Sequence, residues 1–340
     1  MKKPIRFGVI GAGRIGKIHA ETLVTRIPGV TVKSIADVVQ ASSQQAAEQL
    51  HIPVSTTDYR EMLDDPEIDA VAICSSSDTH AKIIIEAAQA SKHIFCEKPI
   101  SLDLAQIDAA LAAVEKAGFK LQIGFNRRFD PNFRKVRKLV ADGKIGDPHI
   151  LRITSRDPAP PPIEYIKVSG GIFLDMTIHD FDMARYQMGC EVTEVYVAGG
   201  VLVNSEIGEV GDIDTAIVTL RFENGAIGTI DNSRKAVYGY DQRVEVFGSG
   251  GMVAVGNNTP DTHVYSNSEG VQSSLPLFFF LERYTDSYIA EMREFVECIQ
   301  NDTIPPVTGI DGRIPVLIGM AAWKSYKENR PVKLSEIEST

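Results

Sequence analysis

The sequence is poor in features that mark several classes of protein. Its 340 residues include only four cysteines, and aromatic residues make up 7%, with a single tryptophan. The cysteines are widely separated and form no Cys-x-x-Cys pair, so we expect no structural zinc site. Cys74 and Cys96 stand in apolar runs, as reduced core cysteines do. This cysteine usage favours a cytoplasmic protein.

Excess positive charge and long apolar runs are absent as well. The 35 lysines and arginines are outnumbered by 45 aspartates and glutamates, and the formal net charge is -10. Such a charge argues against nucleic acid or an anionic membrane surface as a partner. No apolar run reaches the roughly 20 residues that span a bilayer, and the start, Met-Lys-Lys-Pro, lacks the apolar segment of a secretory leader. We therefore expect a cytoplasmic globular protein, long enough for two domains.

A glycine-rich turn near the start predicts a dinucleotide site. An apolar run at 5–10 is followed by Gly-Ala-Gly-Arg-Ile-Gly and then by a helical pattern. In this context Gly11 permits a tight turn, Gly13 lets the backbone approach a pyrophosphate, and Gly16 lets helix and strand pack closely. An ordinary glycine turn without a ligand is the alternative. The cofactor contacts expected in the turn are Gly11, Ala12, Gly13, Arg14 and Ile15.

The second predicted strand, at 30–36, ends on Asp37, about 20 residues after the glycine turn. A carboxylate at this point accepts hydrogen bonds from the ribose hydroxyls of the cofactor. It also repels a 2′-phosphate, and residues 38–40 offer no arginine to receive one. The pattern favours NAD over NADP.

Strands and helices continue to alternate as far as residue 125, which predicts a doubly wound parallel sheet over residues 1–125. The strand at 69–74 runs into Ser75 and Ser76, whose hydroxyls either line the cofactor or cap the next helix. His80 follows in that helix, and we include it among the cofactor residues. Arg127 follows the sixth strand, where it either meets the cofactor or substrate or simply joins the sheet to the next helix.

Glu97, Lys98 and Pro99 end a predicted buried strand. Proline cannot extend a central strand, so Lys98 is held at the strand's carboxyl end, where parallel sheets bind ligands. A lysine in this place is a candidate for charge stabilisation or proton transfer, and we expect both Glu97 and Lys98 to contact the cofactor. The alternative is a surface ion pair at a turn.

The remainder, residues 126–340, has a different pattern, in which strands follow strands. Segments 215–222 and 226–232 flank Asn224-Gly225, and a second hairpin spans 243–255. We therefore expect an α+β substrate-binding and oligomerisation domain with a large, open, mostly antiparallel sheet. A helix at 173–188 is expected to cover one face. Two amphipathic helices are expected near the C-terminus, and the sequence leaves open which of the two domains they pack against.

Within that predicted helix, Asp175, His179 and Asp182 stand at i, i+4 and i+7 and form one stripe. A carboxylate one turn from an imidazole orients it and raises its basicity, as a general base requires. A surface Asp–His pair is the plain alternative. A metal site is a third reading, but no further ligand with fixed spacing is evident, so we expect no metal.

These motifs together resemble the glucose–fructose oxidoreductase and inositol dehydrogenase family. The resemblance rests on the glycine turn at 11–16, on Glu97-Lys98-Pro99, and on Gly170-Gly171 leading into Asp175-x-x-x-His179. It covers essentially the whole chain. It implies an N-terminal Rossmann domain, a second domain whose open sheet mediates assembly, often into tetramers, and NAD as the cofactor of a polyol or sugar dehydrogenase.

The resemblance also implies a reaction and a set of residues. The expected reaction is oxidation of a ring hydroxyl of inositol, with scyllo- or chiro-inositol or an aldose as the alternative. A regulator that senses NAD or sugar without turnover is the non-enzymatic alternative, and a sensor has no use for a proton acceptor. The catalytic residues implied are Lys98, Asp175 and His179. The implied substrate contacts are Lys98, Arg127, Arg156, Asp157, Asp175, His179, Tyr238 and Tyr240. Residues 154–157 differ from the His and Asn that the resemblance leads us to expect there, so the identity of the polyol substrate is left open.

Overall fold

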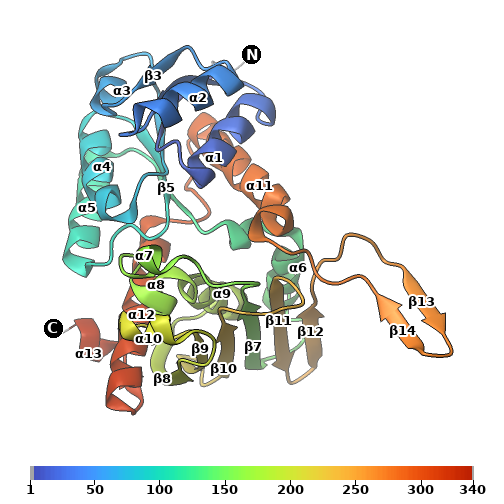
Figure 1. Cartoon of the computed structure of the whole chain (residues 1–340). Coiled ribbons are helices and arrows are strands. Elements are labelled where there is room, and N and C mark those ends of the chain that lie inside the picture. Colours follow the sequence, from blue (N-terminus) through green and yellow to red (C-terminus); the bar gives the residue numbers. More distant parts are fainter. Residues whose placement is uncertain (1–3, 339–340) are drawn as a thin grey trace. The chain divides into compact units, whose positions relative to one another are not determined.

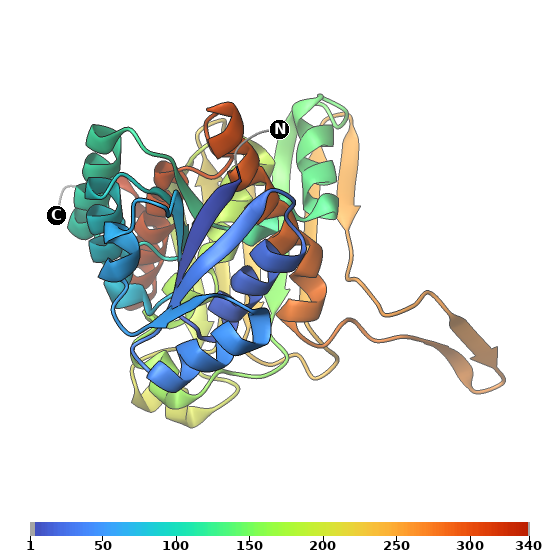
Figure 2. The same ribbon diagram turned by 90° about the horizontal axis from the view of Figure 1, so that it is seen from above.

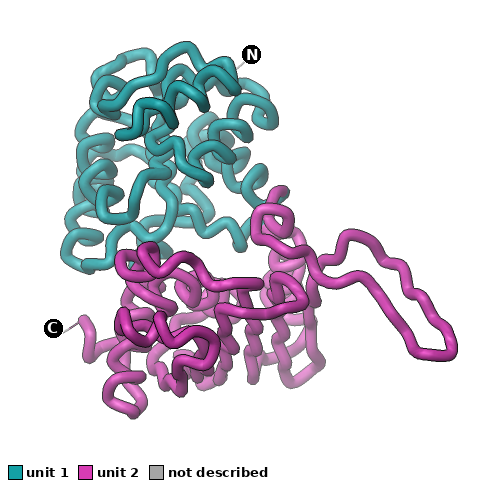
Figure 3. Tube along the Cα trace, in the orientation of Figure 1, with its two compact units in different colours: residues 1–129, 286–314 teal, residues 130–285, 315–340 magenta. Residues whose placement is uncertain are grey.

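The computed structural model describes residues 4–338, and the chain divides into two compact units (Figure 3). Unit 1 runs up to Phe129 and includes Asp286–Ile314, whereas unit 2 holds Asp130–Thr285 and the residues from Pro315 on. Sequence analysis left open which domain the C-terminal helices join. In the structure, α11 (Phe280–Asn301) and α12 (Gly309–Glu328) each contain residues of both units. Among the residues described, no helix is long and apolar enough to cross a membrane.

Unit 1 contains a six-stranded, fully parallel sheet in the order β3-β2-β1-β4-β5-β6. The predicted doubly wound sheet is confirmed. The order reverses between β1 and β4, and ligands of such sheets bind at the carboxyl ends of the strands beside this reversal. The strands are β1 Ile5–Ile10, β2 Val30–Ala36, β3 Val54–Thr56, β4 Ala70–Ile73, β5 His93–Glu97 and β6 Leu121–Gly124. The helices are α1 Arg14–Thr25, α2 Gln40–Leu50, α3 Arg60–Asp64, α4 Ser77–Gln89 and α5 Leu104–Ala117.

Helices cover both faces of this sheet, which explains why β4 is apolar and buried throughout. Helices α1 and α2 and the unit 1 part of α11 lie on one face, and α4 and α5 lie on the other (Figures 1 and 2). On the first face, Phe295 of α11 packs edge-on against Phe7 of β1, with ring centroids 6.2 Å apart. A helix distant in sequence therefore completes the core of unit 1.

Unit 2 contains a seven-stranded sheet in the order β12-β11-β7-β10-β9-β8-β15. Only the β7–β10 pair is parallel among the described strands of this sheet, so the predicted mostly antiparallel sheet is confirmed. Both predicted hairpins, β9–β10 and β11–β12, are present. The strands are β7 Pro148–Arg156, β8 Val192–Gly200, β9 Thr215–Phe222, β10 Ile227–Ser233, β11 Asp241–Gly248, β12 Gly251–Val255 and β15 Val332–Lys333.

The two faces of this sheet differ. Helices α6 (Pro131–Ala141) and α9 (Ile178–Met188) pack against one face (Figure 1). The opposite face carries partly exposed apolar side chains between charged ones, including Tyr196, Ile217 and Phe247. The remaining helices of unit 2 are short: α7 Ile163–Ile166, α8 Gly171–Asp175, α10 Ser205–Glu209 and α13 Ser335–Glu338.

Two elements of unit 2 differ from the expectation. The single helix predicted at 173–188 is wrong, because α8 ends at Asp175 and α9 begins at Ile178, with Met176 and Thr177 between them. A hairpin of β13 (Val264–Asn267) and β14 (Gly270–Ser273) was not foreseen, and it extends away from the rest of unit 2 (Figure 1). All eight of its strand residues are exposed. Such strands need no alternation of apolar and polar residues, so the sequence carried no strand signal here.

Candidate active site

The three glycines of the turn between β1 and α1 have different steric roles. Gly11 has a φ of +102°, and a Cβ there would lie 2.5 Å from the Cys74 carbonyl oxygen. A Cβ on Gly16 would lie 1.9 Å from the Gly11 oxygen, so only glycine lets α1 approach the turn. Gly13, by contrast, precedes α1 and has no atom within 4 Å of its Cβ position. That open space at a helix N-terminus fits a phosphate group of NAD.

Asp37 lies directly after β2 and is bound to the same turn. Its Oδ2 accepts a hydrogen bond from the Ala12 amide at 2.7 Å, and its Oδ1 accepts one from the Val39 amide at 2.8 Å. A carboxylate has about four lone-pair sites, so it can also accept bonds from ribose hydroxyls. Val38 and Val39 are exposed and apolar, and no basic side chain follows Asp37 to bind a 2′-phosphate. The geometry fits NAD.

Lys98 follows the carboxyl end of β5, which is the edge of the sheet that carries the glycine turn, because all six strands are parallel. Glu97 is only 8% exposed. Its Oε1 lies 2.6 Å from Nε2 of His19, a buried residue of α1 that sequence analysis missed. His19 stands three positions after Gly16, on the same buried face of the helix, and that spacing was the available signal in the sequence. Glu97 thus joins the lysine's strand to the helix of the glycine turn.

His80 supports the neighbouring strand ends. Its Nδ1 lies 2.8 Å from the Pro99 carbonyl oxygen and its Nε2 lies 3.0 Å from that of Ser75. Burial lowers the pKa of His80 below its usual value. Because both ring nitrogens face the backbone, this geometry does not support the direct cofactor contact that we predicted. Through Nδ1, His80 contacts the backbone of Pro99, the neighbour of Lys98.

The other predicted cofactor residues lie at the same edge. The Ser75 hydroxyl is 2.7 Å from that of Thr79, whereas Ser76 is exposed at the start of α4 and makes no capping bond. Arg127 is buried in a short 3-10 helix, Asn126–Phe129, which follows β6. Its neighbour Arg128 donates to Asp311 at 2.9 Å and is therefore structural. Ser76 and Arg127 stay predictions as cofactor contacts.

In unit 2, Asp175 is the last residue of α8, and two side chains hold its carboxylate. The Tyr165 hydroxyl donates to Oδ1 at 2.9 Å, and Nη1 of Arg234 lies 3.4 Å from Oδ2. Arg234 is 1% exposed and is also 3.5 Å from Asp212. Burial and the neighbouring carboxylate of Asp175 raise the pKa of the Tyr165 hydroxyl. Sequence analysis missed Tyr165 and Arg234; Arg234 lies two residues after the predicted strand at 226–232.

A buried polar network fixes the junction between α8 and α9, and hence His179, the second residue of α9. Thr177 donates to Asn232 Oδ1 at 2.7 Å, and Asn232 Nδ2 donates to Asp180 at 2.9 Å and to the Ser155 carbonyl at 3.1 Å. Thr177, Asp180 and Asn232 are fully buried. Breaking such a network is costly because buried polar groups would lose hydrogen-bond partners. It explains how the position of His179 is maintained despite the interrupted helix.

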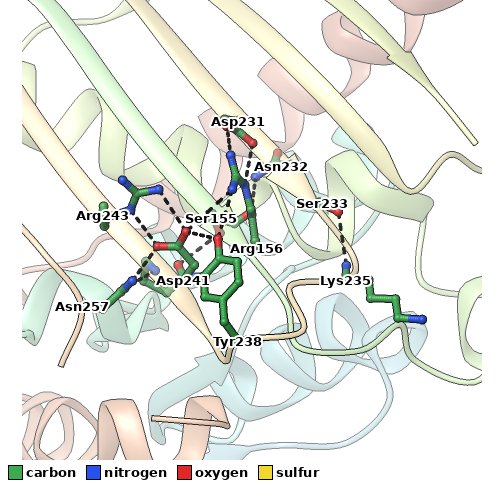
Figure 4. A network of polar contacts seen from close by, with 11 residues as sticks. Ser155, Arg156, Asp231, Asn232, Ser233, Lys235, Tyr238, Asp241, Arg243 and Asn257 are labelled. Atoms are coloured by element: carbon green, nitrogen blue, oxygen red, sulfur yellow. Dashed lines mark hydrogen bonds and ion pairs between the residues drawn. The ribbon is translucent and has the colours of Figure 1, made fainter. Parts of the chain in front are cut away.

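Arg156 lies on the other face of the sheet. Ser155 pairs in register with Asn232, whose side chain bonds to Asp180 of α9, and side chains alternate along a strand. Arg156 forms a two-pronged ion pair with Asp231, and its Nη1 donates to the Tyr238 hydroxyl at 3.1 Å (Figure 4). Arg156 stays a prediction as a substrate contact.

Tyr238 belongs to the same network, since its hydroxyl also donates to the buried Asp241 at 2.6 Å (Figure 4). Burial and the bond to Asp241 raise the pKa of Tyr238. Tyr240 is buried and packs edge-on against Tyr284, with centroids 6.0 Å apart. Asp157 is anchored through its backbone, with its amide 2.9 Å from the Ser233 oxygen. Tyr238, Tyr240 and Asp157 stay predictions as substrate contacts.

Comparison with known proteins identifies the family of both units. Residues 5–125 match the oxidoreductase family with an NAD-binding Rossmann fold, and residues 133–254 match the GFO/IDH/MocA C-terminal domain. The chain is 53% identical to a myo-inositol 2-dehydrogenase of Thermotoga maritima, over 98% of this chain and 99% of that protein.

Solved structures agree. A probable dehydrogenase from Thermotoga maritima superposes with a TM-score of 0.96 at 53% identity, covering 98% of this chain and 100% of the other. A scyllo-inositol dehydrogenase from Lactobacillus casei, solved with NAD(H) and scyllo-inositol, has a TM-score of 0.92 at 31% identity, covering 98% and 100%. The resemblance found in the sequence is thereby confirmed. The chain belongs to the GFO/IDH/MocA oxidoreductase family and is an NAD-dependent dehydrogenase.

Proposed function

We propose that this dehydrogenase oxidises a ring hydroxyl of inositol, and that its substrate is myo-inositol, which becomes 2-keto-myo-inositol. The observation that carries the proposal is the anchored Asp175, held by Tyr165 and Arg234 four positions before His179 in the chain. A carboxylate fixed in this way suits the binding of adjacent hydroxyls on a polyol. The 53% identity to a protein named as a myo-inositol 2-dehydrogenase supports the choice of isomer.

Each of the three residues has a distinct role in this proposal. His179 accepts the proton of the reacting hydroxyl, as a general base. Asp175 orients His179 and accepts a hydrogen bond from a neighbouring hydroxyl of the ring. Lys98 donates a hydrogen bond to the reacting oxygen and stabilises the negative charge that develops on it. When bound, NAD supplies the hydride acceptor, and Gly13 and Asp37 would hold its pyrophosphate and ribose.

Other substrates and a different class of function are the competing readings. The relative solved with scyllo-inositol keeps that isomer as a candidate, and an aldose is another. A sensor of NAD or sugar without turnover is the rival from another class. The anchored carboxylate of Asp175, close to His179 in the chain, favours an enzyme, because a sensor gains nothing from an oriented base.

The test is NAD reduction, followed by absorbance, with myo-, scyllo- and chiro-inositol and with a set of aldoses. We expect kcat/KM to be highest for myo-inositol, and the product to be the 2-ketone by mass spectrometry and NMR. A higher value for scyllo-inositol or an aldose would replace the substrate but keep the reaction. Absence of turnover with every compound, together with NADH binding, would support the sensor.

A further inference from the structure

Three ionisable side chains meet inside unit 1: His19 from α1, Glu97 from the end of β5 and Glu291 from α11. Nε2 of His19 is 2.6 Å from Glu97 Oε1 and 3.9 Å from Glu291 Oε1. His19 and Glu291 are fully buried. The cluster therefore connects the helix of the glycine turn, the strand that precedes Lys98, and a helix from the C-terminal part of the chain.

The carboxyl group of Glu291 lacks the partners that an ionised group needs. Gln122 donates to the backbone oxygen of Glu291 at 2.9 Å. Among the described residues, neither carboxyl oxygen has a hydrogen-bond partner, and no lysine or arginine pairs with it. A buried charge without a partner is strongly disfavoured. Burial, and then the charge of Glu97, raise the pKa of Glu291 well above its usual value. Burial without a partner therefore favours the protonated form of Glu291.

The other groups around the cluster add no compensating charge. Burial raises the pKa of the Cys74 and Cys96 thiols well above the usual value, so both are neutral. Tyr288 of α11 packs edge-on against His19, with ring centroids 5.6 Å apart. Glu97 and His19 are thus the only groups among these neighbours that can bear a charge beside Glu291.

A metal ion is the obvious alternative occupant, because the three ligand atoms lie within 4.8 Å of one another. However, the 2.6 Å between His19 and Glu97 is a hydrogen-bond length. Two ligands of one zinc ion, each about 2.0–2.2 Å from it, stand more than about 3 Å apart in tetrahedral geometry. The spacing favours a shared proton over a metal.

We propose that Glu291 is a positioning residue for the reaction: its buried, protonated carboxyl group packs beside the hydrogen-bonded His19–Glu97 pair without adding a second negative charge, and so keeps the Glu97–Lys98 end of β5 against α1. The other side of the Glu97 carboxyl group rests on Gly124, where a Cβ would come within 2.9 Å of its Oε2. Glu97 is therefore held from both sides, and Lys98 is the next residue. The expected effect on turnover rests on the proposed function, whereas the expected effects on Tm and NADH affinity do not.

The proton on Glu291 makes stability depend on pH. In the unfolded chain a glutamate loses its proton near its ordinary pKa of about 4.3. The folded protein keeps that proton, so folding takes up a proton above this pH and the stability contributed by Glu291 falls as pH rises. Glu291→Gln imitates the protonated form and does not titrate. The Tm of Glu291→Gln should therefore exceed that of wild type by an amount that grows between pH 5 and 8.

The experiment compares wild type, Glu291→Gln, Glu291→Leu and the control Glu297→Gln, an exposed glutamate of the same helix. Tm is measured from pH 5 to 8, NADH affinity by fluorescence titration, and kcat with the best polyol. We expect Glu291→Gln to keep kcat and NADH affinity within about twofold. Glu291→Leu should lower kcat about 10-fold or more, because small displacements of a catalytic group have effects of this order. Glu297→Gln should match wild type at every pH.

Three outcomes would overturn the inference. The first is a Tm difference between Glu291→Gln and wild type that stays constant with pH. The second is normal kcat and NADH affinity in a folded Glu291→Leu. The third is activity that chelators remove and Zn²⁺ or Mn²⁺ restores, which would make the cluster a metal site. If no polyol is oxidised, the proposed function fails, and the Tm series still decides whether Glu291 holds the proton.

Discussion

The Ala12 amide donates a 2.7 Å hydrogen bond to the Asp37 carboxylate, which ties the glycine turn to the end of β2. Asp37 thus has two roles, since it shapes the turn and presents acceptors to the cofactor. Replacing Asp37 by Ala should weaken NAD binding about 10- to 100-fold, because hydrogen bonds to a charged group contribute about 1.5–3 kcal/mol. The preference for NAD over NADP should narrow.

The measurement is kcat/KM with both cofactors. Asp37→Asn keeps one acceptor oxygen for the Ala12 amide, so its kcat/KM with NAD should fall less than that of Asp37→Ala. Glu48→Ala, at an exposed position of α2, is the control and should change neither value. A wild-type preference for NADP would show that Asp37 does not serve the ribose.

Replacing Lys98 by Met should lower kcat about 10²- to 10⁴-fold and leave NADH binding nearly unchanged. The reason is that a positioned donor acts mainly on the charge that develops in the transition state. Steady-state kinetics and an NADH titration measure the two effects separately. Lys82→Met, on the exposed side of α4, is the matched control. Near-normal turnover in Lys98→Met would remove Lys98 from the catalytic residues.

His179 and Asp175 should control the pH dependence of oxidation. If His179 is the base, the rate rises with pH through one ionisation, and His179→Ala loses that ionisation with most of the rate. Asp175→Asn should weaken substrate binding and move the ionisation to lower pH, since it removes a negative charge near the imidazole. EDTA should have no effect. An unchanged profile in His179→Ala would assign the proton to another group, and restoration of EDTA-treated enzyme by zinc would indicate a metal.

Tyr165 should act through Asp175. Replacing Tyr165 by Phe removes the hydroxyl that donates to Asp175 Oδ1 and should raise KM or lower kcat about fivefold, in line with about 1 kcal/mol for a lost hydrogen bond. Kinetics with the best polyol measure the effect. Tyr265→Phe, on the exposed β13–β14 hairpin, is the control. A Tyr165→Phe enzyme with wild-type kinetics would show that Asp175 is oriented without the Tyr165 hydroxyl.

The open face of the unit 2 sheet should mediate assembly into a homo-oligomer, which we propose to be a tetramer. Ile217 of β9, on that face, is 46% exposed, and exposed apolar groups that gather on one face mark interaction surfaces. Ile217→Asp should shift the protein to smaller species by sedimentation velocity. Val264→Asp, on the exposed hairpin, should not. A monomeric wild type, or dissociation by Val264→Asp alone, would contradict this use of the sheet.

The sequence by itself predicted those parts of the fold that are set by neighbouring residues, such as turns and strand ends. The glycine turn, the strand ending on Asp37 and the lysine before Pro99 combine residue types with positions along one strand or turn, and unit 1 has the parallel sheet they imply. The Asn224-Gly225 turn likewise joins β9 and β10 as expected. Side-chain alternation and turn chemistry are properties of neighbouring residues, so they are readable without the fold.

Tertiary structure decided which side chains support the site, because these contacts join residues far apart in the chain. Arg234 lies 59 positions from Asp175, and Asn232 lies 52 positions from Asp180. Helical periodicity predicted one helix at 173–188, but the buried bond from Thr177 to Asn232 lies where α8 ends and α9 begins. Arg156 and Ser155 are neighbours in sequence yet serve opposite faces of a sheet. The residue types at the site were legible from the sequence, whereas burial and long-range pairing determined their partners.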